Sequence, residues 1–152
     1  MEKKDLYKEL SAQAAALLQP QFGWLSNAAN LSALIFNALP DLNWAGFYVL
    51  DGEMLRLGPF QGKPACTEIP LGKGVCGTAA ATRKTQLVPD VHQFAGHIAC
   101  DSASKSEIVV PIIAGGHVWG VLDIDSPVLA RFDKADRSGL EDLVKIFVES
   151  SF

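Results

Sequence analysis

The sequence predicts an α+β fold, in which helices at both ends of the chain cover one face of a mostly antiparallel sheet. Two observations indicate this class. Segments near both ends have apolar residues at helical spacing, whereas the middle of the chain holds short apolar runs joined by tight turns. Helices that flank a group of hairpins are typical of a layered α+β domain. With 152 residues the chain is expected to form one domain, residues 1–152, around one sizeable core.

The first part of the chain is expected to form two helices. An amphipathic stripe predicts a helix over 3–19 that ends at Pro20, and a second stripe predicts a helix over 27–38 that ends before Pro40. The apolar residues of these stripes are Leu6, Leu10, Ala14 and Leu17 in the first helix, and Leu31, Leu34 and Ile35 in the second.

The middle of the chain predicts two β-hairpins. In the first, the aromatic and β-branched run 43–50 and the run 54–58 flank the turn DGE. In the second, the runs 107–113 and 117–125 flank the turn AGG. Pro111 has no N–H to donate, so it predicts a bulge or an edge position in its strand.

The remaining segments are expected to be short elements and loops. Residues 58–66, GPFQGKPAC, contain too much Gly and Pro for regular structure, whereas 74–84 predicts a short helix and 85–89 a short strand. Residues 90–106 form a long polar connection, and loops of this length are often functional. Asp133 can cap a terminal helix whose apolar residues again follow a helical stripe.

Composition and charge exclude several classes of function. The chain has 13 Lys and Arg against 17 Asp and Glu, and no basic face that would suit nucleic acid. No stretch approaches the roughly 18 apolar residues of a membrane span, and the N-terminus MEKKDLYKEL lacks the apolar centre of a secretion signal. We therefore expect a cytoplasmic protein that binds neither nucleic acid nor membrane.

The three cysteines require separate interpretations, because their odd number argues against a purely structural set of disulfides. None belongs to a C-x-x-C pair, so no zinc ribbon or thioredoxin-like motif is present. Cys66 and Cys100 lie in polar, Gly-containing loops, where a thiol is accessible and is typically a nucleophile or a redox partner. Cys76, in a predicted helix, has the pattern of a small buried apolar residue.

A cluster of acidic residues is predicted on one face of the sheet. Side chains two apart on a strand share a face, so Asp123 and Asp125 point the same way, together with Trp119 and Val121. Glu107 begins the paired strand and is expected near them. Because nearby carboxylates repel one another, the cluster requires a metal ion, a ligand ammonium group or a protonated carboxyl group.

Trp44 and Tyr48 share one strand face with Gly46 between them, which predicts open space over the strand and a floor for a small ligand. Structural alternatives exist for each of these features. The aspartates could end a strand and cap a turn, and the aromatic residues could belong to the core. The histidines lack H-x-x-x-H spacing, which favours solvated or hydrogen-bonded side chains over metal ligands. These histidines are His92, His97 and His117.

Five motifs occur in an order that resembles the free methionine-(R)-sulfoxide reductases, which are stand-alone GAF-domain enzymes. The motifs are NWAGFYVL, LGPFQGKPAC, GKGVCGTAAA, DVHQFAGHIACDSASKSEIVVPI and GVLDIDSP. The resemblance covers essentially the whole chain. It implies a GAF domain with a six-stranded antiparallel sheet, with the N- and C-terminal helices on one face and the ligand pocket on the other.

The resemblance also implies a role for each cysteine. Cys100 in GHIACDS matches the family's catalytic cysteine, Cys66 in GKPAC its resolving cysteine, and Cys76 in GVCG a secondary redox partner. The positions that match the substrate pocket of the family are Trp44, Tyr48, Glu107, Asp123 and Asp125. Ala95 departs from the pattern, because the family has Pro there, and this change is expected to loosen the loop that holds Cys100.

The implied reaction begins with attack of the Cys100 thiolate on the sulfoxide sulfur, with Asp125 or Glu107 as proton donor. Asp123 is expected to pair with the substrate ammonium group, and backbone N–H groups of 74–77 with its carboxylate. No metal or bound organic cofactor is expected. Thioredoxin, supplied by NADPH and thioredoxin reductase, is the expected external reductant, and the family commonly forms homodimers. The (R) preference rests on the resemblance alone.

Two other functions remain open from the sequence. A GAF domain can act as a small-molecule sensor without catalysis, although 152 residues leave no room for an output module. The carboxylates and histidines could alternatively form a metal-binding module.

Overall fold

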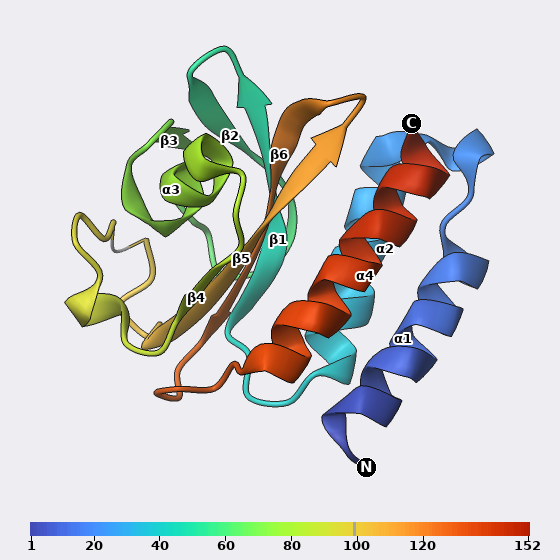
Figure 1. Ribbon diagram of the computed structural model, residues 1–152, viewed down its shortest axis with the longest axis horizontal. Helices are drawn as coiled ribbons and strands as arrows, with labels where there is room; N and C mark the ends of the chain where they lie inside the picture. The colour runs from blue at the N-terminus through green and yellow to red at the C-terminus, as the bar shows by residue number, and fades with distance from the viewer. Residues whose placement is uncertain (99) are drawn as a thin grey trace.

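The computed structural model describes residues 1–98 and 100–152, which form a six-stranded antiparallel sheet covered on both faces (Figure 1). The strand order is β3-β2-β1-β6-β5-β4. The strands are β1 (Trp44–Asp51), β2 (Met54–Gly62), β3 (Glu68–Pro70), β4 (Gln86–Val88), β5 (Ser106–Ala114) and β6 (His117–Ser126). The helices are α1 (Lys3–Leu17), α2 (Gly23–Ala38), α3 (Gly74–Thr82) and α4 (Lys134–Ser151), with short 3₁₀ turns η1 (Pro20–Phe22) and η2 (Val91–Gln93). The predicted α+β class is confirmed.

The two faces of the sheet bury different sets of side chains. On one face α2 and α4 pack against the strands, and α1 packs against these two helices (Figure 1). The core between helices and sheet includes Leu31, Phe47, Ile124 and Phe147. A second, smaller core forms on the other face, under α3 and the connecting loops. No helix in the described residues is long and apolar enough to cross a membrane.

The helix ends follow local capping chemistry. Asp133 accepts hydrogen bonds from the backbone N–H groups of Ala135 and Asp136, and the Asp136 side chain accepts one from the Asp133 N–H, which completes a capping box. The predicted cap of the terminal helix is therefore confirmed. α2 begins at Gly23, earlier than the expected start at 27, because η1 and a positive φ of 80° at Gly23 direct the chain into the helix.

β2 continues to Gly62, so the expectation that 58–66 lacks regular structure is wrong for its first half. Gly46 pairs with Phe60, but the next pair along β1 is Tyr48 with Leu57, so two residues of β2 face one residue of β1. Pro59 lies in this bulge, where the missing N–H of proline interrupts no ladder. β3 was not predicted, because a three-residue strand shows too little alternation to detect.

A second bulge changes the face of Trp119. The pairing of β5 with β6 shifts between Ile112 and Ile113, which leaves Trp119 without an opposite residue. The extra residue reverses the alternation, so Trp119 packs on the helix side against Trp24. The expectation that Trp119 shares a face with Val121 is therefore wrong. A bulge does occur near Pro111, but its extra residue is Trp119 in β6 and not a residue of the strand that contains Pro111, which pairs with Val121.

Candidate active site

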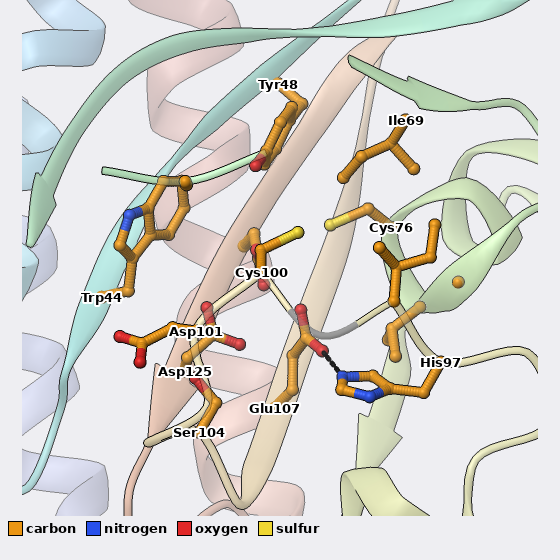
Figure 2. A pocket seen from close by; sticks show the side chains of 15 residues that line it. Trp44, Tyr48, Ile69, Cys76, His97, Cys100, Asp101, Ser104, Glu107 and Asp125 are labelled. Carbon is orange, nitrogen blue, oxygen red and sulfur yellow. Dashed lines mark ion pairs between the residues drawn. The ribbon is translucent and has the colours of Figure 1, made fainter. Parts of the chain in front are cut away.

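A cavity of about 490 Å³, its mouth included, opens on the sheet face opposite the helical layer (Figure 2). Its floor is formed by β1, β5 and β6, one wall by the start of α3, and its rim by the loops that carry the two accessible cysteines. All five predicted pocket residues line this cavity, together with Cys76 and Cys100. The sheet topology thus gathers residues that are distant in the sequence.

The acidic cluster forms because β5 and β6 are paired in a fixed register. Glu107 lies directly opposite Asp125, and Val109 lies opposite Asp123, so the three carboxyl groups share one face. Glu107 and Asp123 are each only 6% exposed. The predicted proximity of these three side chains is confirmed, and their predicted roles remain predictions.

Burial controls the protonation of this cluster. It raises the pKa of the Glu107 carboxyl well above its ordinary 4.5, and repulsion from Asp123 and Asp125 raises it further. Burial also raises the pKa of Asp125 well above 3.8, with repulsion from Asp123 as the next cause. Burial raises the pKa of Asp123 too, but hydrogen bonds with Glu107 and Cys76 oppose this increase. Asp123 is therefore the group best able to carry the negative charge, while burial favours the protonated forms of Glu107 and Asp125.

One oxygen of this cluster has no partner. Among the described residues, Asp123 Oδ1 is buried and accepts no hydrogen bond. A buried carboxylate oxygen without a partner is costly, so the site is suited to a donor supplied by a ligand. The described part of the cavity wall contains no Lys or Arg, and His97 is its only basic side chain.

The aromatic floor differs in one respect from the expectation. The Trp44 ring stacks between Tyr48, at 5.9 Å between ring centroids, and Phe60, at 5.1 Å. Gly46 does not leave open space, because a Cβ at this position would overlap the Cβ of Phe60. The glycine instead allows the bulged β2 to approach β1 closely, and Phe60 takes the predicted gap.

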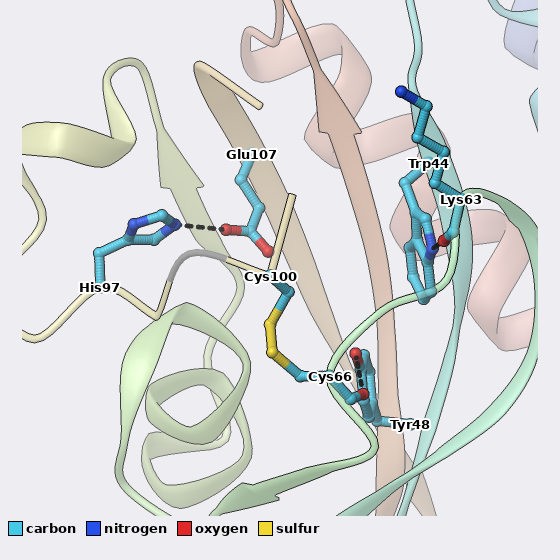
Figure 3. The surroundings of a disulfide bond; sticks show 7 residues. All are labelled: Trp44, Tyr48, Lys63, Cys66, His97, Cys100 and Glu107. Carbon is cyan, nitrogen blue, oxygen red and sulfur yellow. Dashed lines mark hydrogen bonds and ion pairs between the residues drawn. A yellow bond between two sulfur atoms is a disulfide. The ribbon is translucent and has the colours of Figure 1, made fainter. Parts of the chain in front are cut away.

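Trp44 and Tyr48 also hold the segment that carries Cys66 (Figure 3). Trp44 Nε1 donates a hydrogen bond to the Lys63 carbonyl at 3.1 Å, and the Tyr48 hydroxyl donates one to the Cys66 carbonyl at 2.9 Å. Sequence reasoning placed these two side chains in the pocket, but their bonds to residues 63–66 carry no sequence signal, since the acceptors are backbone atoms.

Cys66 and Cys100 form a disulfide, with 5.3 Å between their Cα atoms (Figure 3). This places together the two thiols that the sequence analysis identified as accessible. Cys76 is 4% exposed in α3, and burial raises the pKa of its thiol well above 9.0. Its sulfur and one oxygen each from Glu107 and Asp123 lie within 4.8 Å of one another. A neutral thiol in this position is a hydrogen-bond donor rather than a nucleophile.

Sequence reasoning missed a hydrogen-bond network behind Cys100. Asn43 Nδ2 donates to Asp101 Oδ2 and to Ser104 Oγ, both at 3.0 Å. Asp101 Oδ1 accepts from the Ala103 N–H at 2.9 Å, which forms an Asx turn. The run DSAS offered a signal for that turn, whereas the contact with Asn43 is visible only after folding. The network anchors the loop to the start of β1.

The histidines occupy three different environments. His97 lies at the cavity edge, with Nε2 4.0 Å from Glu107 Oε1, and burial lowers its pKa below 6.5, with His92 as a second cause. His92 is exposed beside Asp90, with Nδ1 3.3 Å from its carboxylate. His117 is exposed at the start of β6. In the described residues the structure thus brings one histidine to the site.

Comparison with known proteins identifies relatives along almost the whole chain. A model described as "GAF domain" matches residues 4–147. The free methionine-R-sulfoxide reductase of Escherichia coli is 51% identical over 144 residues, which are 95% of this chain and 87% of that protein.

Solved structures agree with this comparison. The structure titled as fRMsr of Staphylococcus aureus in complex with substrate is 53% identical, covers 95% of this chain and 94% of its own, and has a TM-score of 0.90. The free methionine-R-sulfoxide reductase from Neisseria meningitidis in complex with its substrate is 43% identical, covers 99% and 90%, and has a TM-score of 0.95. The chain therefore belongs to the GAF-domain family of free methionine-(R)-sulfoxide reductases.

Proposed function

We propose that the protein reduces free L-methionine-(R)-sulfoxide to L-methionine, with Cys100 as the nucleophile and Cys66 as the resolving thiol. The observation that supports this most directly is the Cys66–Cys100 disulfide at the rim of a cavity with buried acidic groups. The similar proteins that carry this activity in their names support the substrate and its (R) configuration.

The reaction starts from the reduced protein. The Cys100 thiolate attacks the sulfoxide sulfur with two electrons, while a protonated carboxyl group donates its proton to the sulfoxide oxygen. The protonated oxygen then moves from the methionine sulfur to the Cys100 sulfur while the bond between the two sulfur atoms breaks and its electron pair stays on methionine, which gives methionine and a Cys100 sulfenic acid. Glu107 and Asp125 are the proton donors that the cluster offers, because burial raises the pKa of both carboxyl groups and so favours their protonated forms.

The second step closes the disulfide. The Cys66 thiol attacks the sulfenic sulfur of Cys100 and loses its proton, and the hydroxyl group of the sulfenic acid leaves as water. An external dithiol, for which we propose thioredoxin supplied by NADPH and thioredoxin reductase, then returns two electrons and two protons. None of these steps uses a bound metal or organic cofactor. The cytoplasm, where thiols are kept reduced, is the compartment we propose, and a homodimer is the assembly expected from the family.

Asp123 accounts for the selection of a free amino acid. Its unpartnered Oδ1 can accept a hydrogen bond from the substrate ammonium group, which a residue inside a peptide lacks. The substrate carboxylate is assigned to N–H groups at the start of α3, where Gly74, Val75 and Cys76 line the cavity. Trp44 offers a ring for the S-methyl group.

The test is oxidation of NADPH through thioredoxin reductase and thioredoxin with three substrates: the free (R) sulfoxide, the free (S) sulfoxide and a peptide-bound sulfoxide. We expect turnover of the first alone. Cys100→Ser is expected to abolish methionine formation, and Cys66→Ser to allow a single turnover but no sustained one. Full turnover by Cys100→Ser would remove the proposed nucleophile.

Two alternatives have distinct signatures. A sensor would bind a small molecule tightly and reduce no sulfoxide. A metal-binding module, for which Cys76, Glu107 and Asp123 lie close enough, would retain a stoichiometric ion through purification. The activity assay tests the sensor alternative, and elemental analysis of the same protein tests the metal-binding alternative.

A further inference from the structure

The proposed reaction leaves the supply of protons to the buried acid unexplained. Each turnover transfers one proton from a carboxyl group to the sulfoxide oxygen, and the donor must regain it before the next turnover. The Glu107 side chain is 8% exposed. Direct exchange of its proton with bulk water is therefore restricted, and a second titratable group between Glu107 and solvent is needed.

His97 occupies that position. Its Nε2 atom lies 4.0 Å from Glu107 Oε1, and its side chain is 17% exposed, about twice the exposed fraction of Glu107. Figure 2 shows His97 and Asp125 on opposite sides of Glu107. A separation of 4.0 Å is longer than a hydrogen bond, but a small rotation of the ring, or one bridging water, brings it within the range for proton transfer.

The other groups near Glu107 cannot serve this purpose. Asp123 and Asp125 on β6 belong to the same buried cluster, and Cys76 on α3 holds its proton because burial raises its pKa. Among the described residues of the cavity wall, His97 is the only histidine, the residue type whose ordinary pKa lies closest to neutral pH.

A tight turn fixes the backbone of His97. The His97 N–H donates to the Phe94 carbonyl at 3.2 Å, and Gly96 has a φ of 77°, which together close a tight turn. His97 stands three residues before Cys100, so one loop carries both this imidazole and the nucleophile. Glu107 from β5 is paired with the ring, and His92 from η2 is close enough to lower the pKa of His97.

We propose that His97 relays protons between solvent and the buried Glu107 carboxyl group, and so restores the acid between turnovers. This inference rests on the proposed function. His97 acts through Glu107 and contacts no reacting atom in this assignment, so it is a positioning and relay residue. Because burial lowers the pKa of His97, its imidazole is mainly neutral at pH 7 and can accept a proton from solvent and pass it on.

The first test follows the Glu107 proton without substrate. After a rapid drop in pH, infrared spectroscopy follows the growth of the carboxylic-acid C=O band, which is assigned to Glu107 by its loss in Glu107→Gln. We expect slower growth of this band in His97→Gln and His97→Ala, and acceleration of His97→Ala by added imidazole. His117→Gln, an exposed histidine at the start of β6, is the control and should match the unsubstituted protein. Unchanged kinetics in His97→Gln would overturn the relay.

The second test compares steady-state and single turnover of the free (R) sulfoxide at saturating dithiothreitol. With the acid protonated beforehand, His97→Gln should form methionine in the first turnover at close to the normal rate. Its steady-state rate should fall at least about tenfold, which is less than the roughly 10²–10⁴-fold contribution of a general acid because His97 acts through Glu107. Imidazole should restore His97→Ala.

Loss of both rates together, or failure of imidazole to restore turnover, would indicate a structural role and contradict the relay. If the unsubstituted protein reduces no sulfoxide, the proposed function fails, and the infrared measurement still decides the relay.

Discussion

At the scale of single residues, Trp44 and Tyr48 each have two structural roles, and their sequence context alone does not reveal both. Each ring lines the cavity, and each polar atom donates a hydrogen bond to the segment 63–66. Buried Trp and Tyr side chains usually pack their rings in apolar surroundings and donate a hydrogen bond from their polar atom. The same two residues therefore line the cavity floor and hold the segment that carries Cys66.

Tyr48→Phe should slow closure of the disulfide. The bond from its hydroxyl to the Cys66 carbonyl is worth about 0.5–1.5 kcal/mol, and its loss should slow attack of Cys66 on the sulfenic acid roughly 2- to 12-fold. Rapid quenching that follows methionine and free thiol separately measures both steps. Tyr7→Phe is the control, because Tyr7 donates to Asp136 in the helical layer. Equal rates of thiol loss in the two variants would contradict the proposed tether.

The carboxyl groups show the same dependence on context. Glu107, Asp123 and Asp125 belong to two amino-acid types with ordinary pKa values near 4, and the sequence could place them together but could not rank them. Their ranking comes from burial and from the hydrogen bonds of Asp123. The folded cluster thus adds a physical reason to the roles expected from the resemblance, in which Asp123 binds the ammonium group and Glu107 or Asp125 donates the proton, and these roles remain proposals.

At the scale of elements, the turn 94–97 shows how one position adjusts the Cys100 loop. His97 N–H bonds to the Phe94 carbonyl, Gly96 has a φ of 77°, and Ala95 is not in the positive-φ region, which are the features of a type II turn. Proline is favoured at the position of Ala95 in this turn, and Phe94 already has the extended ψ of 120° that a following proline requires. The family's proline would therefore fit here.

Ala95→Pro should stabilise the protein by about 0.4–1 kcal/mol, because it restricts the unfolded chain without straining the folded turn. In the described part of the chain, no hydrogen bond from the Ala95 N–H would be lost. Chemical denaturation measures the free energy of unfolding, and hydrogen exchange at the His97 amide reports on the turn. Ala95→Gly, which loosens the unfolded chain, should change stability in the opposite direction. A less stable Ala95→Pro protein would contradict the turn assignment.

Two β-bulges determine which face of the sheet some side chains occupy. One in β2 accommodates Pro59 and brings Phe60 against Gly46, and one beside Ile112 turns Trp119 toward the helices. Strand alternation predicts faces correctly only up to such an inserted residue. This is why the face of Asp123 and Asp125 was predicted correctly and that of Trp119 was not.

At the scale of the whole molecule, the main apolar core and the acidic cavity lie on opposite faces of the sheet. The larger apolar core lies between the sheet and the layer of α1, α2 and α4, whereas the acidic cluster lies on the other face under α3. Substitutions in the cavity can therefore change the chemistry while the main core remains intact. The cluster itself is nevertheless expected to reduce the stability of the fold, since it buries ionisable groups.

The stability of the oxidised protein should fall as pH rises through the titration of this cluster. The folded-state pKa values of Glu107 and Asp125 lie above their ordinary values of 4.5 and 3.8, so above about pH 4 the folded state binds more protons than the unfolded state. Unfolding is then increasingly favoured until the folded groups also ionise. Glu107→Gln removes one of these groups, so it should be more stable than the unsubstituted protein at pH 8, with a smaller difference near pH 4.

Denaturant titrations at pH 4, 6 and 8 measure this effect. Glu53→Gln is the control, because Glu53 is exposed in the turn between β1 and β2 and should show a smaller pH-dependent difference. A stability difference for Glu107→Gln that is the same at all three pH values would contradict a raised pKa at Glu107.

The sequence by itself determined the helices at both ends, the two hairpins, the Asp133 cap and the shared face of Asp123 and Asp125, because each depends on a local period or on a cap within a few residues. Its motifs also indicated the family and the cysteines that matter. The pairing of Cys66 with Cys100, 34 residues apart, was implied by the resemblance, but no local pattern predicts it. Tertiary structure alone decided the contact of Phe60 with Gly46, the Asn43 network and the approach of His97 to Glu107. These contacts depend on strand register, bulges and backbone acceptors, which come together only in the folded sheet and leave no periodic signal in the chain.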